Sequence, residues 1–442
     1  MKKLSAKILA VALSAFIAAV PLGACSSNGS TGSGTDSKTQ STASENQEES
    51  SEPAPEGVVE LDFWNGFTGS DGAILEQIVA KFNEKYDGQF KVNMDIMSWD
   101  VFYQKFNPSI ASGTAPNFVI ASQNKIPMYA DNGTYQEIGD LFTDYDVDES
   151  NILQSFLDCC KYEDQYYATP MFNGFLSLWY NKDLLAEAGY DQPPKTMDEL
   201  FEYAKAMTDS SKGQYGLSVE TTWISPSLLI WSWNNGGDAI SEAGEAVWNS
   251  EENVEIFTEL QKLVREDGIS PVGINFDESV KLYLGGNLAM FYCGPWILQD
   301  VLDSGLNYGV TGFPGDVQYG YTSCFGVTTA NTDTERDGCM KFLEFFYSDE
   351  IQLFWSLESG FPTYSKSVME MAEYKENDVQ ASIAPYLEDA KIFMVDAPNA
   401  DVIYNDILWP SFQEIIVGGE DVKGSLDAAN EELTGWIDEN LK

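Results

Sequence analysis

The eight residues from Trp231 to Asp238 combine two indole rings, two amides, two glycines and a carboxylate. Indole faces bury a large apolar area against a flat partner, while the ring N–H still needs an acceptor. Amide and carboxylate groups beside such faces can bind hydroxyl groups at the rim of a pocket. A sugar ring has apolar C–H faces and a polar edge, so Trp231, Trp233, Asn234 and Asp238 are candidate sugar ligands.

The same stretch has a second interpretation that needs no ligand. A buried strand end followed by the Asn235–Gly236 turn would use the same residue types. If the segment is extended, Trp231 and Trp233 point to opposite faces, because one residue separates them. Only one of the two indoles would then stack on a sugar, and the sequence does not decide which.

Composition limits the classes of function. A chain of 442 residues is long enough for two or three domains. The net charge of −46 argues against a nucleic-acid partner, because phosphate binding needs clusters of Lys and Arg. The chain has no histidine, which excludes Ser–His and Cys–His catalysis and any zinc site with a histidine ligand. We expect no cofactor and no metal, and we expect a monomer.

Two further patterns are weighed and set aside. Asp144, Asp146 and Asp148 match the first ligand spacings of a calcium loop, but Glu149 and Ser155 stand where glycine and glutamate are needed. The cysteines form no paired CxxC framework, and adjacent cysteines rarely have disulfide geometry. Beyond Cys25 we therefore predict a mostly reduced, structural set, comprising Cys159, Cys160, Cys293, Cys324 and Cys339.

The N-terminal region has the layout of an export signal. Three lysines precede an apolar run over residues 8–20, which is too short to span a bilayer. Leu22-Gly23-Ala24-Cys25 resembles the lipobox of bacterial lipoproteins, which implies a signal peptide over 1–24 and a lipid on Cys25. Residues 26–57 contain no large apolar side chain, so we predict that 25–57 form a disordered tether.

Hydrophobic periodicity predicts the elements that would position a site. A strand over 58–64, a helix over 74–86 and a strand over 90–97 form a βαβ unit, which favours a parallel sheet. Ligands bind beyond the carboxyl ends of such strands, where Trp64, Asn65 and Thr68 lie. A helix over 101–111 and a strand over 118–121 follow, and that strand leads into Ser122, Gln123 and Asn124.

Several blocks in a fixed order carry a family resemblance. They are Gly113–Asn117 before an alanine-ended strand, Gln165–Pro170 ("YxxP"), Leu178–Leu184 ("YYNKD"), Pro193–Leu200 ("PPKTWDEL"), Gly286–Met290 with Gly294–Trp296 ("GxxAM…GPW") and Gly360–Thr363 ("GxPT"). The chain resembles the sugar-binding lipoproteins of bacterial ABC importers, family 1 solute-binding proteins similar to maltose-binding protein. Within these blocks Thr196 and Glu199 form a capping box, which independently predicts a helix start.

The resemblance implies an α/β, two-lobe periplasmic-binding-protein-like fold of type II, with a hinge and an interlobe cleft. Lobe 1 would be residues 58–172 plus 318–355, and lobe 2 would be 173–317 plus 356–442. Hinge crossings would fall near 172–176 and 314–318. Trp296, Tyr321, Tyr404 and Trp409 join the candidate ligand residues by their positions, and the number of aromatics favours an oligosaccharide.

The function implied is capture of that sugar by a lipid-anchored protein on the outer face of the bacterial membrane, followed by delivery to permease subunits. Two alternatives stay open. A lipid-anchored glycan hydrolase needs only two carboxylates about 5–9 Å apart, and 70 acidic residues do not exclude it. A peptide or polyamine receptor of the same fold would need an acid in the cleft, for which Asp238 is available. Asn117 and Trp179 depart from the family pattern and leave the sugar's identity open.

Overall fold

The computed structural model describes residues 57–172, 174–221, 227–393, 395 and 397–441. The predicted signal peptide, Cys25 and the tether up to residue 56 lie outside the described residues. Within the described part of the chain, none of the helices combines the length and the apolar composition that a bilayer crossing needs.

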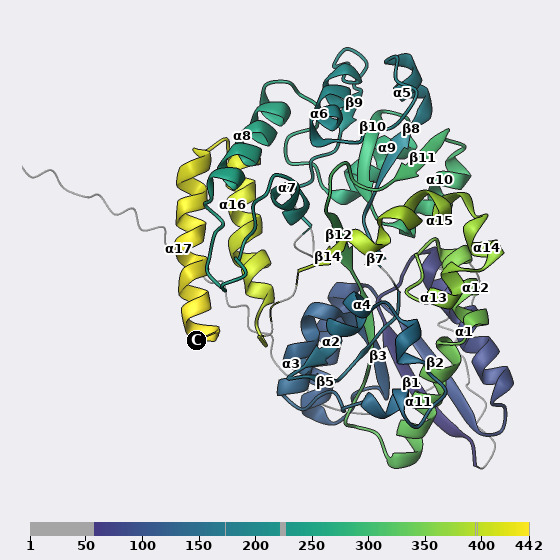
Figure 1. Cartoon of the computed structure of the whole chain (residues 1–442). Coiled ribbons are helices and arrows are strands. Elements are labelled where there is room, and N and C mark those ends of the chain that lie inside the picture. Colours follow the sequence, from purple (N-terminus) through teal and green to yellow (C-terminus); the bar gives the residue numbers. More distant parts are fainter. Residues whose placement is uncertain (1–56, 173, 222–226, 394, 396, 442) are drawn as a thin grey trace, which may run out of the picture. The chain divides into compact units, whose positions relative to one another are not determined.

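The first sheet has five strands in the order β2-β1-β3-β13-β6 (Figure 1). Their bounds are Phe90–Ile96 (β2), Val59–Asn65 (β1), Phe118–Ser122 (β3), Ser323–Val327 (β13) and Thr169–Pro170 (β6). Strand β1 pairs in parallel with β2 and β3, whereas β13 runs antiparallel to β3 and β6. The predicted βαβ unit and its parallel pairing are therefore confirmed.

Helices α1 (Ser70–Lys85), α2 (Trp99–Ser112) and α11 (Asp333–Phe346) contact the first sheet. In Figure 1 the green α11, which is late in the sequence, lies beside the purple strands. The core between them is aromatic: the rings of Phe63 and Phe118 stack with centroids 4.3 Å apart, and Phe342 lies 5.1 Å from Phe118. Burial of these large rings stabilises the part of the protein that is built around the first sheet.

The second sheet has four strands in the order β11-β8-β10-β9, with bounds Tyr308–Thr311 (β11), Ser177–Asn181 (β8), Leu288–Cys293 (β10) and Tyr215–Leu217 (β9). Strand β9 pairs in parallel with β10, and β8 is antiparallel to both β10 and β11. Helix α6 (Met197–Ala206) contacts β9. Its cap differs from the prediction: Thr196 accepts from the Glu199 N–H, but the Glu199 carboxylate accepts from the Lys195 N–H.

A three-stranded sheet, in the order β14-β12-β7, links the two larger ones. Its strands are Ala390–Ile392 (β14), Gln318–Tyr321 (β12) and Gly174–Phe175 (β7). Only Thr322 separates β12 from β13, so one stretch of chain serves both the linking sheet and the first sheet. The remaining strands, Lys161–Tyr162 (β4) and Gln165–Tyr166 (β5), form a hairpin.

The remaining α-helices connect the strands and form the C-terminal segment of the chain. They are α3 (Ile126–Asp131), α4 (Gln154–Asp158), α5 (Lys182–Glu187), α7 (Leu229–Asn234), α8 (Glu251–Arg265), α9 (Phe276–Leu284), α10 (Leu298–Ser304), α12 (Asp349–Ser359), α13 (Lys366–Met369), α14 (Ala372–Lys375), α15 (Asp378–Ile383), α16 (Trp409–Gln413) and α17 (Val422–Asn440). The predicted lobe boundary at residue 355 falls inside α12. Phe361 and Tyr364, which follow this helix, still pack in the core of the first sheet.

The five cysteines after Cys25 carry free, buried thiols, as predicted. Three of them, Cys159, Cys160 and Cys324, have sulfur atoms that all lie within 4.8 Å of one another. The Sγ atoms of Cys160 and Cys324 are 3.4 Å apart.

The close approach of β9 to α6 yields a stability prediction. A Cβ atom on Gly216 would lie 1.8 Å from the carbonyl oxygen of Ala204, so Gly216→Ala must push the strand and the helix apart. We expect this variant to lose about 1–3 kcal/mol of unfolding free energy, the usual cost of overpacking. Urea denaturation of the purified protein measures it.

Gly435→Ala is the matched control. Gly435 lies inside α17 and a Cβ there meets nothing within 4 Å. Alanine should therefore stabilise the protein by up to roughly 1 kcal/mol, because glycine is a poor residue in a helix interior. Equal midpoints for the two variants would contradict the packing of β9 on α6.

Candidate functional site

The stretch from Trp231 to Asp238 begins in a short helix, α7, and not in an extended segment. Our expectation of opposite faces for Trp231 and Trp233 assumed a strand and is wrong on that point. An apolar run of this length does not distinguish a buried strand from a buried helix. Both indoles are buried, and they have different neighbours.

Trp233 is bound by other groups of the protein. Its ring stacks on Tyr319 with centroids 5.9 Å apart, and its Nε1 donates to Asp238 Oδ1 at 2.9 Å. The other oxygen of Asp238 accepts from Lys391 Nζ at 2.6 Å, and that ammonium group lies 4.5 Å from the Trp233 ring centre. Asn234 donates to the carbonyl of Val317 and accepts from its N–H. These polar groups fasten α7 to the segment before β12.

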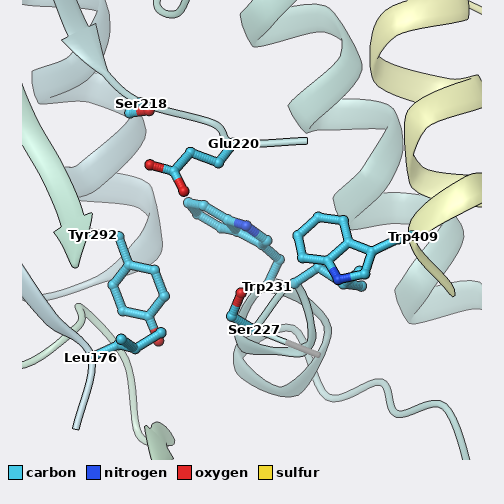
Figure 2. Close-up of a pocket in the computed structure, with 8 residues that line it drawn as sticks. Leu176, Ser218, Glu220, Ser227, Trp231, Tyr292 and Trp409 are labelled. Carbon is cyan, nitrogen blue, oxygen red and sulfur yellow. The ribbon is translucent and has the colours of Figure 1, made fainter. Parts of the chain in front are cut away.

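Trp231 instead lines a small pocket (Figure 2). The lining residues are Leu176, Ser218, Glu220, Ser227, Leu228, Trp231, Tyr292 and Trp409. The pocket's volume is about 20 Å³, room for about one water molecule. Ligand sites usually measure roughly 300–1,000 Å³, so a sugar can enter only after the walls of this pocket separate.

Glu220 is the charged residue of this pocket. It follows β9, and in Figure 2 its carboxyl group points toward the edge of the Trp231 ring. Its Oε1 atom is buried and, among the described residues, has no hydrogen-bond partner. Burial raises the pKa of Glu220 from its usual 4.5 to about 8, and a hydrogen bond from Ser279 opposes that rise.

Tyr292 and Trp409 come to the pocket from distant parts of the chain. Tyr292 lies in β10, next to β9, and burial raises the pKa of its hydroxyl well above 10. Its hydroxyl is buried without a partner among the described groups. Trp409 begins α16, between the π-helical stretches Ile403–Leu408 and Glu414–Gly418. Such wide turns are rare in proteins and frequent at functional sites.

The carboxyl end of β1 presents a second group of candidates. Trp64 is half-buried, Asn65 is fully buried and Thr68 is exposed. The Asn65 side chain accepts from the Phe67 N–H, while its Nδ2 has no partner within the described structure. Asp71, in the first turn of α1, is buried too, and burial raises its pKa.

The residues after β3 contact the C-terminal region. Ser122 is half-buried, and Gln123 is buried and binds Thr322 through its amide oxygen. Asn124 donates to the Tyr404 hydroxyl, and its own Oδ1 has no partner in the described part of the chain. Next to it, Lys125 pairs with Asp401 at 2.5 Å. Polar groups thus connect the end of the first sheet to the helical segment that carries Trp409.

Trp296 packs against three hydrophobic clusters: the core of the first sheet, which includes Phe361, a cluster that includes Trp231, and a cluster that includes Trp179. Tyr321 packs against the first two of these clusters. The centroid of the Trp296 ring lies 6.0 Å from that of Tyr321 and 6.4 Å from that of Phe361. Gly294 permits this position, because a Cβ there would lie 1.9 Å from the Trp296 ring. The Tyr321 hydroxyl is buried without a partner among the described residues.

A larger groove, of about 850 Å³, lies over α6 and α8. Its walls are mostly polar helix side chains, with several carboxylates and two lysines, Lys205 and Lys423. None of the described lining residues carries a buried polar atom that lacks a partner. The pocket around Trp231 is therefore the stronger candidate despite its size.

The structure brings together Trp231 and Trp409 from the predicted set, and it adds Glu220 and Tyr292, which sequence reasoning missed. Both missed residues lie at or beyond the carboxyl ends of the neighbouring parallel strands β9 and β10. The rule that located Trp64 and Asn65 applies equally there. It was not applied because β9, with three residues, is too short to leave a periodic pattern.

Comparison with known proteins agrees with this architecture. Residues 77–381 match the family model of bacterial extracellular solute-binding proteins. The sn-glycerol-3-phosphate-binding periplasmic protein UgpB of Rhizobium meliloti (strain 1021) is 25% identical over 409 residues, covering 85% of this chain and 93% of the relative.

Two solved structures share the fold at lower identity. Maltose-bound MalE3 of T. maritima has a TM-score of 0.75 and 19% identity, covering 86% of this chain and all of that one (100%). The GacH receptor of Streptomyces glaucescens GLA.O, solved unliganded and with acarbose, has a TM-score of 0.77 and 18% identity over 87% of this chain and 99% of that one. The α/β, two-lobe fold of the maltose-binding type is thereby confirmed, and the chain belongs to the family of bacterial extracellular solute-binding proteins.

Proposed function

We propose that this protein is the substrate-binding component of an ABC importer and that it captures a carbohydrate, favoured as an oligosaccharide, for delivery to membrane permease subunits. The observation that carries the proposal is the pocket of Figure 2, in which two indoles and a tyrosine converge with buried polar atoms. Aromatic faces bind the apolar faces of sugars, and unpartnered polar atoms gain hydrogen bonds from sugar hydroxyls.

The ligands of two related proteins of known structure support a carbohydrate over a phosphate ester. MalE3 and GacH were solved with maltose and acarbose, whereas UgpB is named for sn-glycerol 3-phosphate. No Lys or Arg occurs among the described residues that line the pocket, so the described lining offers an anion no cationic partner. A phosphate group needs cationic or N–H donors, so phosphate esters are disfavoured here.

The proposed mechanism is closure of a hinge. A pocket of about 20 Å³ does not admit a sugar, so the solute must enter when the two halves are apart. Contacts such as Lys125–Asp401 and Asn124–Tyr404 would form again on closure. The solute stabilises the closed state by binding it more tightly than the open one, and the permease would recognise that state.

The alternatives fit the pocket less well. Glycoside hydrolysis needs two carboxyl groups on either side of the scissile bond, and the described lining contains one, Glu220. The peptide or polyamine alternative loses the residue that was named for it, because Asp238 is already paired with Lys391. For the N-terminal region we keep the proposal that Cys25 carries a lipid and holds the protein at the outer face of the cell membrane.

The first test separates a receptor from an enzyme. The purified chain, begun at residue 26, is incubated with neutral oligosaccharides such as maltodextrins and cellodextrins and with amino-sugar oligosaccharides such as chitosan oligomers, and the mixtures are analysed by calorimetry and chromatography. We expect saturable binding of at least one class and no shortening of any glycan. Release of shorter products would contradict the receptor function, and failure of every glycan to bind would contradict the carbohydrate assignment.

The second test uses the two indoles of α7 as a matched pair. Trp231→Phe should weaken binding of the captured glycan by about tenfold, roughly 1.4 kcal/mol, because Trp231 lines the pocket. Trp233→Phe should change the affinity less than about threefold, because Trp233 binds Asp238 and Tyr319 instead. Calorimetric titration of both variants measures the contrast, and equal losses would remove Trp231 from the site.

The third test concerns the anchor. In cells grown with a labelled fatty acid, the wild-type protein should carry the label and fractionate with the membrane. Cys25→Ser should abolish the label, because the thiol is the proposed point of attachment. Cys339→Ser, at a buried cysteine, is the control and should keep the label. A labelled Cys25→Ser protein would contradict the proposal.

A further inference from the structure

We infer that the captured solute carries a positively charged nitrogen, which binds against Glu220 between the aromatic side chains of Trp231, Tyr292 and Trp409. An amino sugar is the carbohydrate of this chemical class. The inference rests on the proposed function, because it specifies the charge of the solute at the same site.

The first argument is that the Glu220 carboxyl group accepts a hydrogen bond from Ser279 but has no cationic partner among the described lining residues. Its Oε1 atom is buried, and no described donor reaches it. The other lining side chains are serines, leucines and aromatics, so the described pocket contains no cation to balance a carboxylate. Asp238 differs, because Lys391 and the Trp233 N–H both bind it. Asp238 therefore has a cationic partner within the protein, whereas Glu220 has none among the described lining residues.

The second argument is the nature of the walls. Trp231, Tyr292 and Trp409 surround the space in front of Glu220 in Figure 2. Aromatic faces attract cations through the ring quadrupole, and the attraction grows when water is excluded. A buried carboxylate beside such faces favours an ammonium group over a neutral hydroxyl group, because only the ammonium balances the charge. The net charge of −46 also attracts cations from a distance.

The third argument concerns protons. Ser279 donates a hydrogen bond to Glu220, and the Cys293 thiol interacts with it electrostatically. These two groups, and the serines and aromatic residues that line the pocket, are uncharged at neutral pH. The raised pKa of Glu220, about 8, keeps its carboxyl group mostly protonated at pH 7 in the free protein. A bound cation favours the carboxylate, so binding must release this proton. The affinity for a cation should therefore rise with pH and level off above about 8.

The test uses two small probes of the same shape. Choline has a quaternary nitrogen whose charge does not change with pH, and 3,3-dimethylbutan-1-ol has a carbon atom in its place. Calorimetry or a thermal-shift titration on the protein begun at residue 26 compares them at several pH values. We expect choline to bind at least about tenfold more tightly at pH 7.5. Its affinity should rise by up to about tenfold per pH unit between pH 6 and 7.5.

Glu220→Gln is the decisive variant, and Glu242→Gln, at an exposed residue outside the pocket, removes the same charge as a control. The first should abolish the preference for choline and its pH dependence, and the second should leave both unchanged. Without ligand, wild-type stability should fall as pH rises from about 4.5 to 8, because the native state binds more protons than the unfolded state there. Glu220→Gln should flatten that fall, which also confirms that the variant folds.

Each outcome bears on one proposal. Equal binding of the two probes, no binding of either, or a choline preference that survives in Glu220→Gln would overturn the inference. Neutral glycans that bind while choline does not would leave the proposed carbohydrate function intact and remove only the ammonium subsite. Choline binding that depends on Glu220, with no glycan bound, would keep the subsite and remove the carbohydrate assignment.

Discussion

The junction between the first sheet and the linking sheet depends on Thr322. Its hydroxyl donates to the Phe172 carbonyl at 2.7 Å, and its backbone N–H and carbonyl both bind Gln123, each at 3.3 Å. Thr322 is buried, so these bonds are shielded from water and costly to break. Through them a single residue fixes the end of β3, the chain leaving the first sheet and the start of β13. The positions of Ser122, Asn124 and Tyr321 follow from that junction.

The parallel strands of the first sheet could be predicted because their hydrophobic pattern lies within each element. The strand at residues 59–65 alternates, the following helix buries Ile74, Leu75 and Ile78 on one face, and the next strand follows within a short loop. The hydrophobic periodicity that identifies each strand or helix is therefore visible within that element's own residues. The antiparallel β13 could not be found in this way, because it pairs with β3 from about 200 residues away along the chain and its residues, Ser323–Val327, are all buried and carry no alternation.

The site itself was predicted only in part, and the reason is electrostatic. The sequence contains 70 acidic residues, and nothing in their local context shows that Asp238 is paired and that Glu220 lacks a cationic partner. Asp238 stood in an aromatic, glycine-rich stretch and was chosen, yet Lys391, which neutralises it, lies 153 residues further on. Glu220 stood in an ordinary stretch and was overlooked, although its buried Oε1 atom has no partner among the described residues. Pairing over such distances is a property of the fold, so composition and spacing do not reveal it.

The proposed selection of a cationic solute follows from the different roles of the aromatic residues and Glu220 in the pocket. The indole faces of Trp231 and Trp409 can bind the apolar face of a sugar whatever its charge, so they contribute affinity and little discrimination. Discrimination between a cation and a neutral solute falls to Glu220, the one ionisable carboxyl group in the described lining. Because the pKa of Glu220 is raised to about 8, its carboxyl group is mostly uncharged in the free protein at neutral pH. The charge appears only when a cation enters and the proton leaves, so closure, deprotonation and recognition become a single linked event.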